Sequence, residues 1–331
     1  MKPRVAVLVT GGAGFIGSHA CKALHQNGFL PVVFDNLSTG HASAVRFGPM
    51  VHGDVRDAGA VTAALRAHDA CGIIHFAASA YVGESMRDPG LYYDNNLGGM
   101  IGLLKGAAAA AVDKIVFSSS CATYGVPALL PIGEDCPQNP INPYGRTKLI
   151  CEMMLRDHAA AHGLRYAALR YFNAAGADPE GVLGEHHDPE THLIPLALLA
   201  AAGHAPLQVF GTDYPTPDGT CIRDYIHVSD LARAHVLAVK HLLNGGESLA
   251  VNLGTGQGVS VRQIICAIEA MTGQALPVIM GPRRAGDPPM LVANPAESQR
   301  KLGFSPQQSD LATLLAHAAP WFGVAATKVP V

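Results

Sequence analysis

The sequence predicts an α/β fold that consists of a doubly wound parallel sheet and a smaller α/β lobe at the C-terminal end. Two observations lead to this prediction. Short β-branched runs alternate with helix-length amphipathic segments through the first half of the chain, and glycines end several of those segments. The first run, residues 5–9 (VAVLV), is apolar throughout, as expected for a strand that is buried on both faces of a parallel sheet.

The individual elements follow from this alternation. Strands are predicted at residues 5–10, 31–35, 50–53, 72–77, 114–119 and 165–172, and helices at 18–27, 61–68, 92–112 and 144–162. After residue 172, loop residues become frequent at 173–191 and 211–219. Shorter elements are predicted at 207–210, at 250–253, in a helix capped near residues 229–230, and in a helix between Ser260 and Gly273. We therefore expect a first domain at 1–172 and a binding lobe at 173–331, with some elements of the lobe packing back on the first domain.

Composition excludes several classes of protein. The chain has 331 residues, with 23 Lys plus Arg against 26 Asp plus Glu, so its near-neutral charge gives no reason to expect nucleic acid or anionic lipid as a partner. With 49% hydrophobic and 15% charged residues it can build a large core, which excludes disorder. Its apolar runs fall far below the ~20 residues that span a bilayer. Seven cysteines without a C-x-x-C pair favour a reducing, cytoplasmic compartment.

A glycine-rich turn follows the first predicted strand and precedes a helix. Gly11, Gly14 and Gly17 have the spacing G-x-x-G-x-x-G, which lets backbone N–H groups approach a pyrophosphate at the positive end of the helix. Asp35 ends the second strand, 21 residues beyond Gly14. A carboxylate there can accept both ribose hydroxyls of adenosine and repel a 2′-phosphate, so NAD is predicted over NADP. Asp54 ends the third strand, where an adenine edge could lie.

A set of three polar side chains indicates acid–base chemistry. Tyr144 and Lys148 have i, i+4 spacing at the start of a predicted helix, so both lie on one face, where the ammonium group favours the phenolate. Ser120 follows a strand 24 residues upstream, at the edge of the sheet where a ligand would bind. The sequence therefore predicts Tyr144 as a base, Lys148 as the group that lowers its pKa, and Ser120 as a hydrogen-bond partner of the reacting hydroxyl.

These motifs resemble the extended short-chain dehydrogenase/reductases, and within that family the UDP-glucose (UDP-galactose) 4-epimerases. The resemblance runs nearly end to end and includes TGGAGFIGSH, VVFDNLSTG, GDVRD, SSSCATYG, NPYGRTK, LRYFNAAGA, DGTCIRDYIHV and RRAGD. It implies a Rossmann-type domain, a tightly held NAD, a homodimer, and interconversion of UDP-galactose and UDP-glucose by transient oxidation at carbon 4 of the sugar.

The resemblance also implies site residues. The catalytic groups are Ser120, Tyr144 and Lys148. The implied NAD contacts are Gly11, Gly14, Phe15, Ile16, Gly17, Asp35, Asn36, Leu37, Ser38, Thr39, Gly40, Asp54, Val55, Phe76, Ala77, Ala78, Ala80, Asn95, Tyr144, Lys148 and Phe172. The implied substrate contacts are Ser120, Tyr144, Asn173, Leu193, Phe210, Arg223, Arg284, Asp287 and Leu291.

Three positions depart from the family pattern. Ala80 stands where many members have a lysine, with Tyr81 beside it as a candidate replacement. His192 stands where an asparagine is frequent, and Leu291 stands where an aromatic residue is frequent beside the 2-substituent of the sugar. The last two positions bear on which sugar fits.

Other functions remain to be weighed against this one. A nucleotide-sugar 4,6-dehydratase needs an Asp-Glu pair directly after the strand-end hydroxyl, but this chain has Cys121 and Ala122 there, so dehydration is rejected. A UDP-xylose/UDP-arabinose or UDP-N-acetylhexosamine 4-epimerase shares the same core chemistry and stays open. An NAD-binding redox-sensing scaffold would not need Ser120, Tyr144 and Lys148. No metal is expected, because the Glu- and His-rich residues 184–192 lack the helical spacing of a zinc protease.

Overall fold

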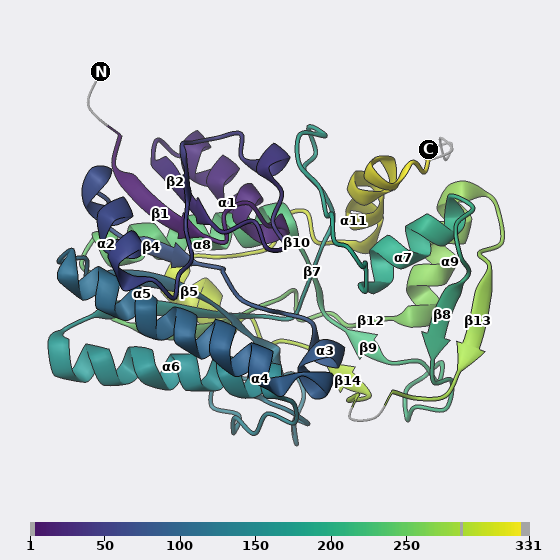
Figure 1. Ribbon diagram of the computed structural model, residues 1–331. Coiled ribbons are helices and arrows are strands. Elements are labelled where there is room, and N and C mark those ends of the chain that lie inside the picture. The colour runs from purple at the N-terminus through teal and green to yellow at the C-terminus, as the bar shows by residue number, and fades with distance from the viewer. Residues whose placement is uncertain (1–3, 285–286, 326–331) are drawn as a thin grey trace.

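The computed structural model describes residues 4–284 and 287–325, and within them the central element is a parallel sheet of seven strands (Figure 1). In spatial order the strands are β11 (Leu249–Leu253), β6 (Arg165–Tyr171), β5 (Lys114–Ser120), β4 (Ile73–His75), β1 (Ala6–Thr10), β2 (Leu30–Asp35) and β3 (Met50–His52). The chain reverses its direction of travel across the sheet between β1 and β4, where a doubly wound sheet opens its ligand crevice. The predicted fold class is confirmed.

The observed strands lie within a few residues of the predicted ones. Strand β1 is buried along its whole length and pairs in register with β2, from Ala6 opposite Leu30 to Thr10 opposite Phe34. The largest difference is at β4, which is three residues shorter than predicted. Phe76 and Ala77 leave the strand because both of their N–H groups turn to the carbonyl of Thr10, at 2.9 and 3.2 Å.

Helices cover both faces of the sheet (Figure 1). A buried apolar cluster fills the interface on each face. On one face lie α1 (Phe15–Gln26), α8 (Val228–Leu243) and α10 (Ala296–Leu302), and on the other lie α2 (Ala58–Ala67), α5 (Gly98–Ala109) and α6 (Pro143–His162). Strand β11 and helices α8 and α10 follow residue 172 in the sequence, so the second half of the chain completes the sheet of the first.

The helix predicted at 92–112 is present as far as Ala109, but it contains an irregular turn and begins earlier. The chain forms α3 (Val82–Arg87), α4 (Pro89–Tyr92), one π-helical turn (Tyr93–Leu97) and then α5. Within that turn the Asn96 amide bonds both the N–H and the carbonyl of Ser79, at 2.8 and 3.1 Å. Helix α5 also packs closely on Val55, where a Cβ at Gly102 would lie 2.2 Å from the Val55 carbonyl oxygen. These two contacts hold the irregular turn.

The second half of the chain forms a lobe beside the sheet. Helix α9 (Val261–Thr272) begins at Ser260 with a capping box and ends at Gly273, as predicted. Helix α8 is capped by His227, not by Ser229 or Asp230, because the His227 Nδ1 accepts the N–H of Ser229 at 3.0 Å. The lobe also contains helices α7 (Leu193–Ala201) and α11 (Leu311–Ala318) and three small sheets. The first sheet pairs β7 (Asn173–Ala175) with β10 (Tyr225–His227), and the second places β9 (Ile222–Arg223) between β12 (Val259–Ser260) and β14 (Met290–Leu291). The third pairs β8 (Leu207–Phe210) with β13 (Val278–Gly281).

In the ranges that the structure describes, no helix is both long and apolar enough to cross a membrane. All seven cysteines are free.

Candidate active site

The candidate site lies at the carboxyl ends of the parallel strands. The glycine turn follows β1, Asp35 ends β2, Phe76 follows β4, Ser120 ends β5 and Phe172 follows β6. Because these strands are adjacent and parallel, their ends meet at one edge of the sheet. The sheet therefore brings the predicted cofactor and catalytic positions together.

The glycine turn has the backbone that a phosphate-binding turn needs. Gly11 has φ +70°, and a Cβ there would lie 2.6 Å from the backbone nitrogen of Ala77. A Cβ at Gly17 would lie 2.1 Å from the Gly11 carbonyl oxygen, so the turn closes only with glycine at these positions. Helix α1 begins after Gly14 without a side-chain cap and without an acidic residue in its first turn. This uncapped N-terminus suits an anionic group, so the turn fits a dinucleotide pyrophosphate.

Asp35 is held rigidly at the edge of this turn. One carboxylate oxygen accepts the N–H of Ala13 at 3.0 Å and the other accepts the N–H of Leu37 at 2.8 Å. The side chain is buried, and Leu37 takes a left-handed φ of +58° to reach it. Each carboxylate oxygen keeps one lone pair, so Asp35 can still accept the two hydroxyls of a ribose.

The neighbouring predicted contacts form the wall of the same crevice. Gly40 lies against Ala13, since a Cβ at Gly40 would lie 3.0 Å from it. Asp54 binds the Arg56 guanidinium, at 2.8 and 3.0 Å, and the Asn36 amide, at 3.1 Å. The hydrogen bonds from Arg56 lower the pKa of Asp54 to about 2. Asp54 is therefore an ionised group that fixes the loop after β3.

The loop after β4 is tied to the π-helical turn. Asn95 donates to the Ser79 hydroxyl at 3.1 Å. This hydrogen bond fixes the position of the loop segment that contains Ala77, Ala78 and Ala80. Tyr81, beside Ala80, lies against the rings of His187 and His192, with centroids 6.0 and 6.2 Å away. Tyr81 therefore faces the lobe from the position next to the missing lysine.

The three predicted catalytic side chains converge from β5 and α6. Asn142 caps α6, Pro143 begins it, and Tyr144 and Lys148 lie one turn apart on its inner face. The Lys148 Nζ donates to the Ser118 carbonyl at 2.7 Å and lies 5.8 Å from the centroid of the Tyr144 ring. The Tyr144 hydroxyl interacts with the Ser120 hydroxyl. The structure thus brings together Ser120, Tyr144 and Lys148.

Burial dominates the pKa values of Tyr144 and Lys148 in the protein without its cofactor. Burial raises the pKa of Tyr144 to about 12, and the hydrogen bond with Ser120 lowers that pKa by less than burial raises it. Burial also lowers the pKa of Lys148 to about 8, although Cys151 and Glu152 act in the opposite direction. Without a bound cofactor, the desolvation of the buried phenol therefore outweighs the hydrogen bond from Ser120.

Apart from the catalytic residues, the predicted substrate residues lie on the short strands, a helix and a loop of the lobe. Arg223, on β9, donates to the Asp287 carboxylate, and the Arg284 guanidinium stacks on the Phe210 ring with 4.0 Å to the centroid. Asp224, next to Arg223, points elsewhere and accepts the N–H groups of Thr255, Gly256 and Ala293. Leu193 begins α7, and Asn173 begins β7.

Leu291 lies between the arginine and the catalytic strand end. It pairs in register with Arg223, and its side chain contacts a small apolar cluster that contains Cys121, Tyr124 and Phe172. Phe172 is largely buried in this cluster. Burial raises the pKa of Cys121 to about 12, so the thiol next to Ser120 cannot exchange protons near neutral pH. This agrees with the rejection of dehydratase chemistry.

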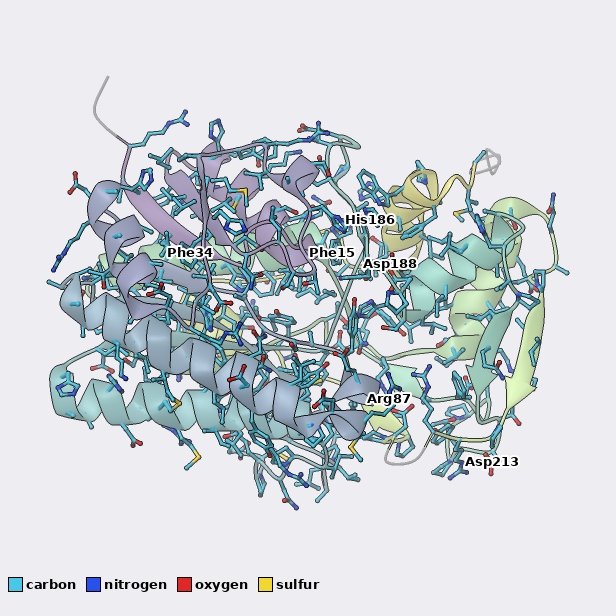
Figure 2. The ribbon with its side chains drawn as sticks, in the orientation of Figure 1. Phe15, Phe34, Arg87, His186, Asp188 and Asp213 are labelled. Carbon is cyan, nitrogen blue, oxygen red and sulfur yellow. The ribbon has the colours of Figure 1, made fainter. Side chains whose placement is uncertain are left out.

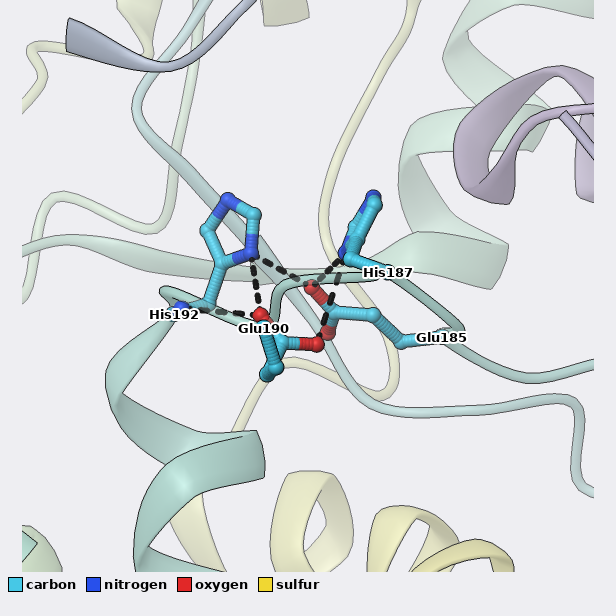
Figure 3. A group of neighbouring side chains, drawn as sticks. All are labelled: Glu185, His187, Glu190 and His192. Carbon is cyan, nitrogen blue, oxygen red and sulfur yellow. Dashed lines mark hydrogen bonds and ion pairs between the residues drawn. The ribbon is translucent and has the colours of Figure 1, made fainter. Parts of the chain in front are cut away.

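Four side chains of the Glu- and His-rich segment 184–192 lie together in the loop before α7, although their spacing gave no reason to expect this. We call Glu185, His187, Glu190 and His192 the Glu/His cluster (Figure 3). Burial alone would lower the pKa of both histidines, but the nearby carboxylates of Glu185 and Glu190 outweigh it and raise the pKa to about 9 for His187 and about 10 for His192. The spacing of the four residues is irregular, so only the folded loop brings them together.

A second missed feature is a buried ionic network under the catalytic residues. Arg170 forms two hydrogen bonds to Glu152, at 2.7 and 2.9 Å, and one to the Tyr124 hydroxyl at 2.8 Å. Ser119, the neighbour of Ser120, donates to the same Glu152 at 2.5 Å. The network therefore joins β5, β6 and α6, the elements that hold Ser120, Tyr144 and Lys148.

Known proteins are similar to this chain over nearly its whole length. Residues 7–254 match the profile of the NAD dependent epimerase/dehydratase family. The UDP-glucose 4-epimerase of Rhizobium meliloti (strain 1021) is 53% identical over 316 residues, which cover 95% of this chain and 96% of that protein. The crystal structure of UDP-glucose 4-epimerase from Brucella ovis in complex with NAD has 60% identity and a TM-score of 0.96, and the match covers 98% of this chain and 100% of that one. The Stenotrophomonas maltophila UDP-glucose-4-epimerase, with bound NAD and formylated UDP-arabinopyranose, has 42% identity and a TM-score of 0.93 over 97% and 98% of the two chains.

Proposed function

Because this chain belongs to the NAD dependent epimerase/dehydratase family, we propose that it interconverts UDP-galactose and UDP-glucose through transient oxidation at carbon 4 of the sugar. The observation that carries the proposal is the convergence of Ser120, Tyr144 and Lys148 at the end of β5, next to a turn that fits a dinucleotide. Cys121 and Ala122 follow Ser120, so the acid and base that sugar dehydration needs are missing at these positions.

The glycine turn and Asp35 would hold NAD through its pyrophosphate and its adenosine ribose. Bound NAD supplies the group that takes a hydride from carbon 4 and gives it back. Tyr144 removes the proton from the 4′-hydroxyl, Ser120 orients that hydroxyl, and Lys148 supplies positive charge on the far side of the phenol ring. After the 4-ketose rotates, Tyr144 returns the proton to the oxygen on the other face, so no net oxidation occurs.

The two arginines suit the diphosphate of UDP. Arg223 and Arg284 present planar guanidinium groups, which bind phosphate oxygens with paired hydrogen bonds. Asp287 orients Arg223, and Phe210 orients Arg284 by stacking. We infer that Asn173 and Leu193 contribute the remaining contacts at the start of β7 and α7.

Conversion of a UDP-sugar without added cofactor tests this function. Purified protein is incubated with UDP-galactose and no added NAD, and UDP-glucose is measured by chromatography. We expect equilibration between the two sugars. Binding of NAD without any conversion would favour the redox-sensing scaffold instead, and faster conversion of UDP-xylose would favour a pentose 4-epimerase.

The cofactor that copurifies should be NAD(H). Asp35 is buried at the end of β2, so a 2′-phosphate on the ribose would lie against its carboxylate, where oxygen atoms of both groups repel each other. Mass spectrometry of the nucleotide released on denaturation measures this directly. Recovery of mainly NADP(H) would contradict the role given to Asp35.

The sugar pocket should favour hexoses without an N-acetyl group. Leu291 is intermediate in volume, and a packed pocket accepts several extra heavy atoms only with strain of ~1–3 kcal/mol. Leu291→Ser should therefore raise activity on UDP-N-acetylglucosamine relative to UDP-glucose by roughly 10–200-fold. The matched control is Val292→Ser, because Val292 is the buried next residue and packs over Gly258. A loss of stability in both variants with no change in the substrate ratio would show that Leu291 only packs the core.

We further propose a homodimer formed through α5 and α6, which run side by side in Figure 1. Ile101 on α5 is 45% exposed and Met153 on α6 is 48% exposed, so each helix of this pair presents an apolar side chain to solvent that a partner chain could cover. Ile101→Glu should reduce the mass in sedimentation from two chains to one. Ile279→Glu changes a similarly exposed apolar residue on β13 and should leave the sedimentation mass at two chains. If Ile279→Glu gave one chain and Ile101→Glu gave two, the interface would lie at β13 instead.

The free cysteines and the near-neutral charge support a reducing, cytoplasmic location, where UDP-sugars would be the partners.

A further inference from the structure

The Glu/His cluster brings together four side chains that can each offer one ligand atom to a metal ion. The loop before α7 turns His187 and His192 toward each other, with Glu185 and Glu190 between them (Figure 3). The nearest nitrogen–oxygen distances are 3.3 and 3.4 Å from the His187 Nδ1 and 2.9 and 3.0 Å from the His192 Nδ1. Zinc–ligand bonds of ~2.0–2.2 Å place neighbouring ligands of a tetrahedron about 3.3–3.6 Å apart. The His–Glu contacts already have about this length, and one ligand atom from each of the four residues lies within 4.8 Å of the others, so the longest separation must shorten when an ion binds.

Two of the four side chains lack a hydrogen-bond partner for an atom that faces the centre. The His187 Nδ1 and the Glu190 Oε2 are both buried and form no hydrogen bond, and only an ion-pair contact of 3.4 Å joins them. The other oxygen of Glu190 accepts the N–H groups of Thr191 and His192, at 2.7 and 2.8 Å. These backbone bonds fix the carboxylate with its free oxygen directed into the cluster.

The charge of the cluster also matches a divalent cation. The side chains of Glu185 and Glu190 are 3% and 9% exposed, so two carboxylates lie together away from water. Buried carboxylates need a positive partner, and here it is either the two imidazoles in their protonated form, whose pKa values the carboxylates raise, or a bound cation that replaces those protons. A divalent ion bound by two neutral imidazoles and these two carboxylates gives a site with no net charge.

The loop that carries the cluster is anchored on both sides. The Trp321 indole donates to the Glu185 carbonyl at 2.8 Å, and Gly184 lies directly beneath that ring, where a Cβ would meet it at 2.1 Å. On the other side, His186 stacks on His41 with centroids 4.1 Å apart. Figure 2 shows His186 and Asp188 beside Phe15 of α1, and the Phe15 ring contacts His187. The ligands therefore sit on a supported loop between the glycine turn and α7.

We propose that Glu185, His187, Glu190 and His192 bind one Zn²⁺ per chain as a structural site. Four protein ligands leave no open position, as in other structural zinc sites. The ion fixes the loop that ends at His192, directly before Leu193 and α7, and so holds the lobe against the glycine turn. Sequence spacing predicted no metal here because these ligands come from an irregular loop, not from one helix face.

Metal binding tests the proposal without any activity measurement. Protein without a histidine tag is treated with a chelator, desalted, and titrated with ZnSO₄, with zinc content read by mass spectrometry and stability by calorimetry. We expect about one Zn²⁺ per chain and a rise in Tm of about 5 °C at 100-fold excess over Kd. In crystals soaked with ZnSO₄, anomalous diffraction at the zinc edge should show one peak among the four side chains.

Variants of the same loop provide the controls. His187→Ala and Glu190→Gln should bind Zn²⁺ at least ~100-fold more weakly, since even the loss of a supporting contact costs 10–100-fold. His186→Ala, which alters the neighbouring histidine outside the cluster, should bind as the unaltered chain does. Circular dichroism checks that each variant folds. Equal zinc content in all four proteins, or an anomalous peak elsewhere, would mean that the cluster is only a set of ion pairs.

Discussion

Tyr144→Phe should lower the turnover of UDP-galactose by about 10²–10⁴-fold, the contribution typical of a positioned acid or base. The substitution removes one oxygen and keeps the ring, which packs edge-on against Tyr92 with centroids 6.4 Å apart. The fold and the affinity for UDP should therefore stay nearly unchanged. Steady-state kinetics give the turnover, and calorimetric titration with UDP gives the affinity.

Tyr171→Phe is the matched control for this prediction. Tyr171 lies next to Tyr144, and its hydroxyl bonds the Ser118 hydroxyl at the same strand end. This variant also loses one buried phenol oxygen, but the proposed mechanism gives that oxygen no proton to move. It should keep most of its activity. If Tyr144→Phe also kept most of its activity, or if both variants lost it equally, Tyr144 would not be the base.

The pH dependence should reveal the role of Lys148. The pKa of Tyr144 is about 12 and that of Lys148 about 8 in the protein alone, so the phenol needs more positive charge than the lysine supplies. We infer that bound NAD⁺, whose nicotinamide is cationic, lowers the tyrosine pKa by about 1–3 units. Lys148→Ala should lose activity at neutral pH and recover part of it as the pH rises, because the phenolate then forms without the cation. A flat profile would give Lys148 only a positioning role.

The sequence predicted the first half of the fold well because its signals are local. Each strand of the parallel sheet is a short apolar run, and glycines or caps bound most of the helices. The π-helical turn was missed because its cause is the pairing of Asn96 with Ser79, a contact across 17 residues. Helix α7 was missed because it is apolar on all sides, so it shows no helical period. The strands of the lobe have two to four residues, too few for an alternating pattern.

The candidate site, like the fold, was predictable from the sequence where its residues form local patterns. Glycine spacing, Asp35 and the Tyr144–Lys148 pair are local patterns, and the order of the strands brings them together. The raised pKa of Tyr144 was not predictable, because desolvation depends on packing that spacing does not contain. The residue types of the Glu/His cluster were visible in the sequence, but their convergence depends on the path of an irregular loop. The Arg170–Glu152 pair joins residues 18 positions apart in different elements, so only the folded chain shows it.

Glu152→Leu should lower the free energy of unfolding by about 3–5 kcal/mol, because it leaves the Arg170 charge buried and without its carboxylate. Both side chains are almost fully buried, at 3% and 6% exposed. Urea unfolding measures the loss. The matched surface variant is Glu297→Leu. In the unaltered chain, Glu297 pairs with Arg300 on the solvent side of α10, where water already screens the two charges, so this variant should leave stability nearly unchanged.

The double variant Glu152→Leu/Arg170→Leu distinguishes a stabilising ion pair from an unpaired charge. The single variant is expected to lose stability mainly because Arg170 stays buried and charged without its carboxylate. In that case the double variant should lose less free energy of unfolding than the sum of the two single variants, and no more than either single variant alone. The Tyr124 hydroxyl keeps a partner in that variant, since it also bonds Asn252 at 2.7 Å. Additive losses would instead mean that each residue contributes through packing. Activity should fall further than stability explains in the single Glu152 variant, because Ser119 loses its partner next to Ser120 and α6 loses the contact one turn beyond Lys148.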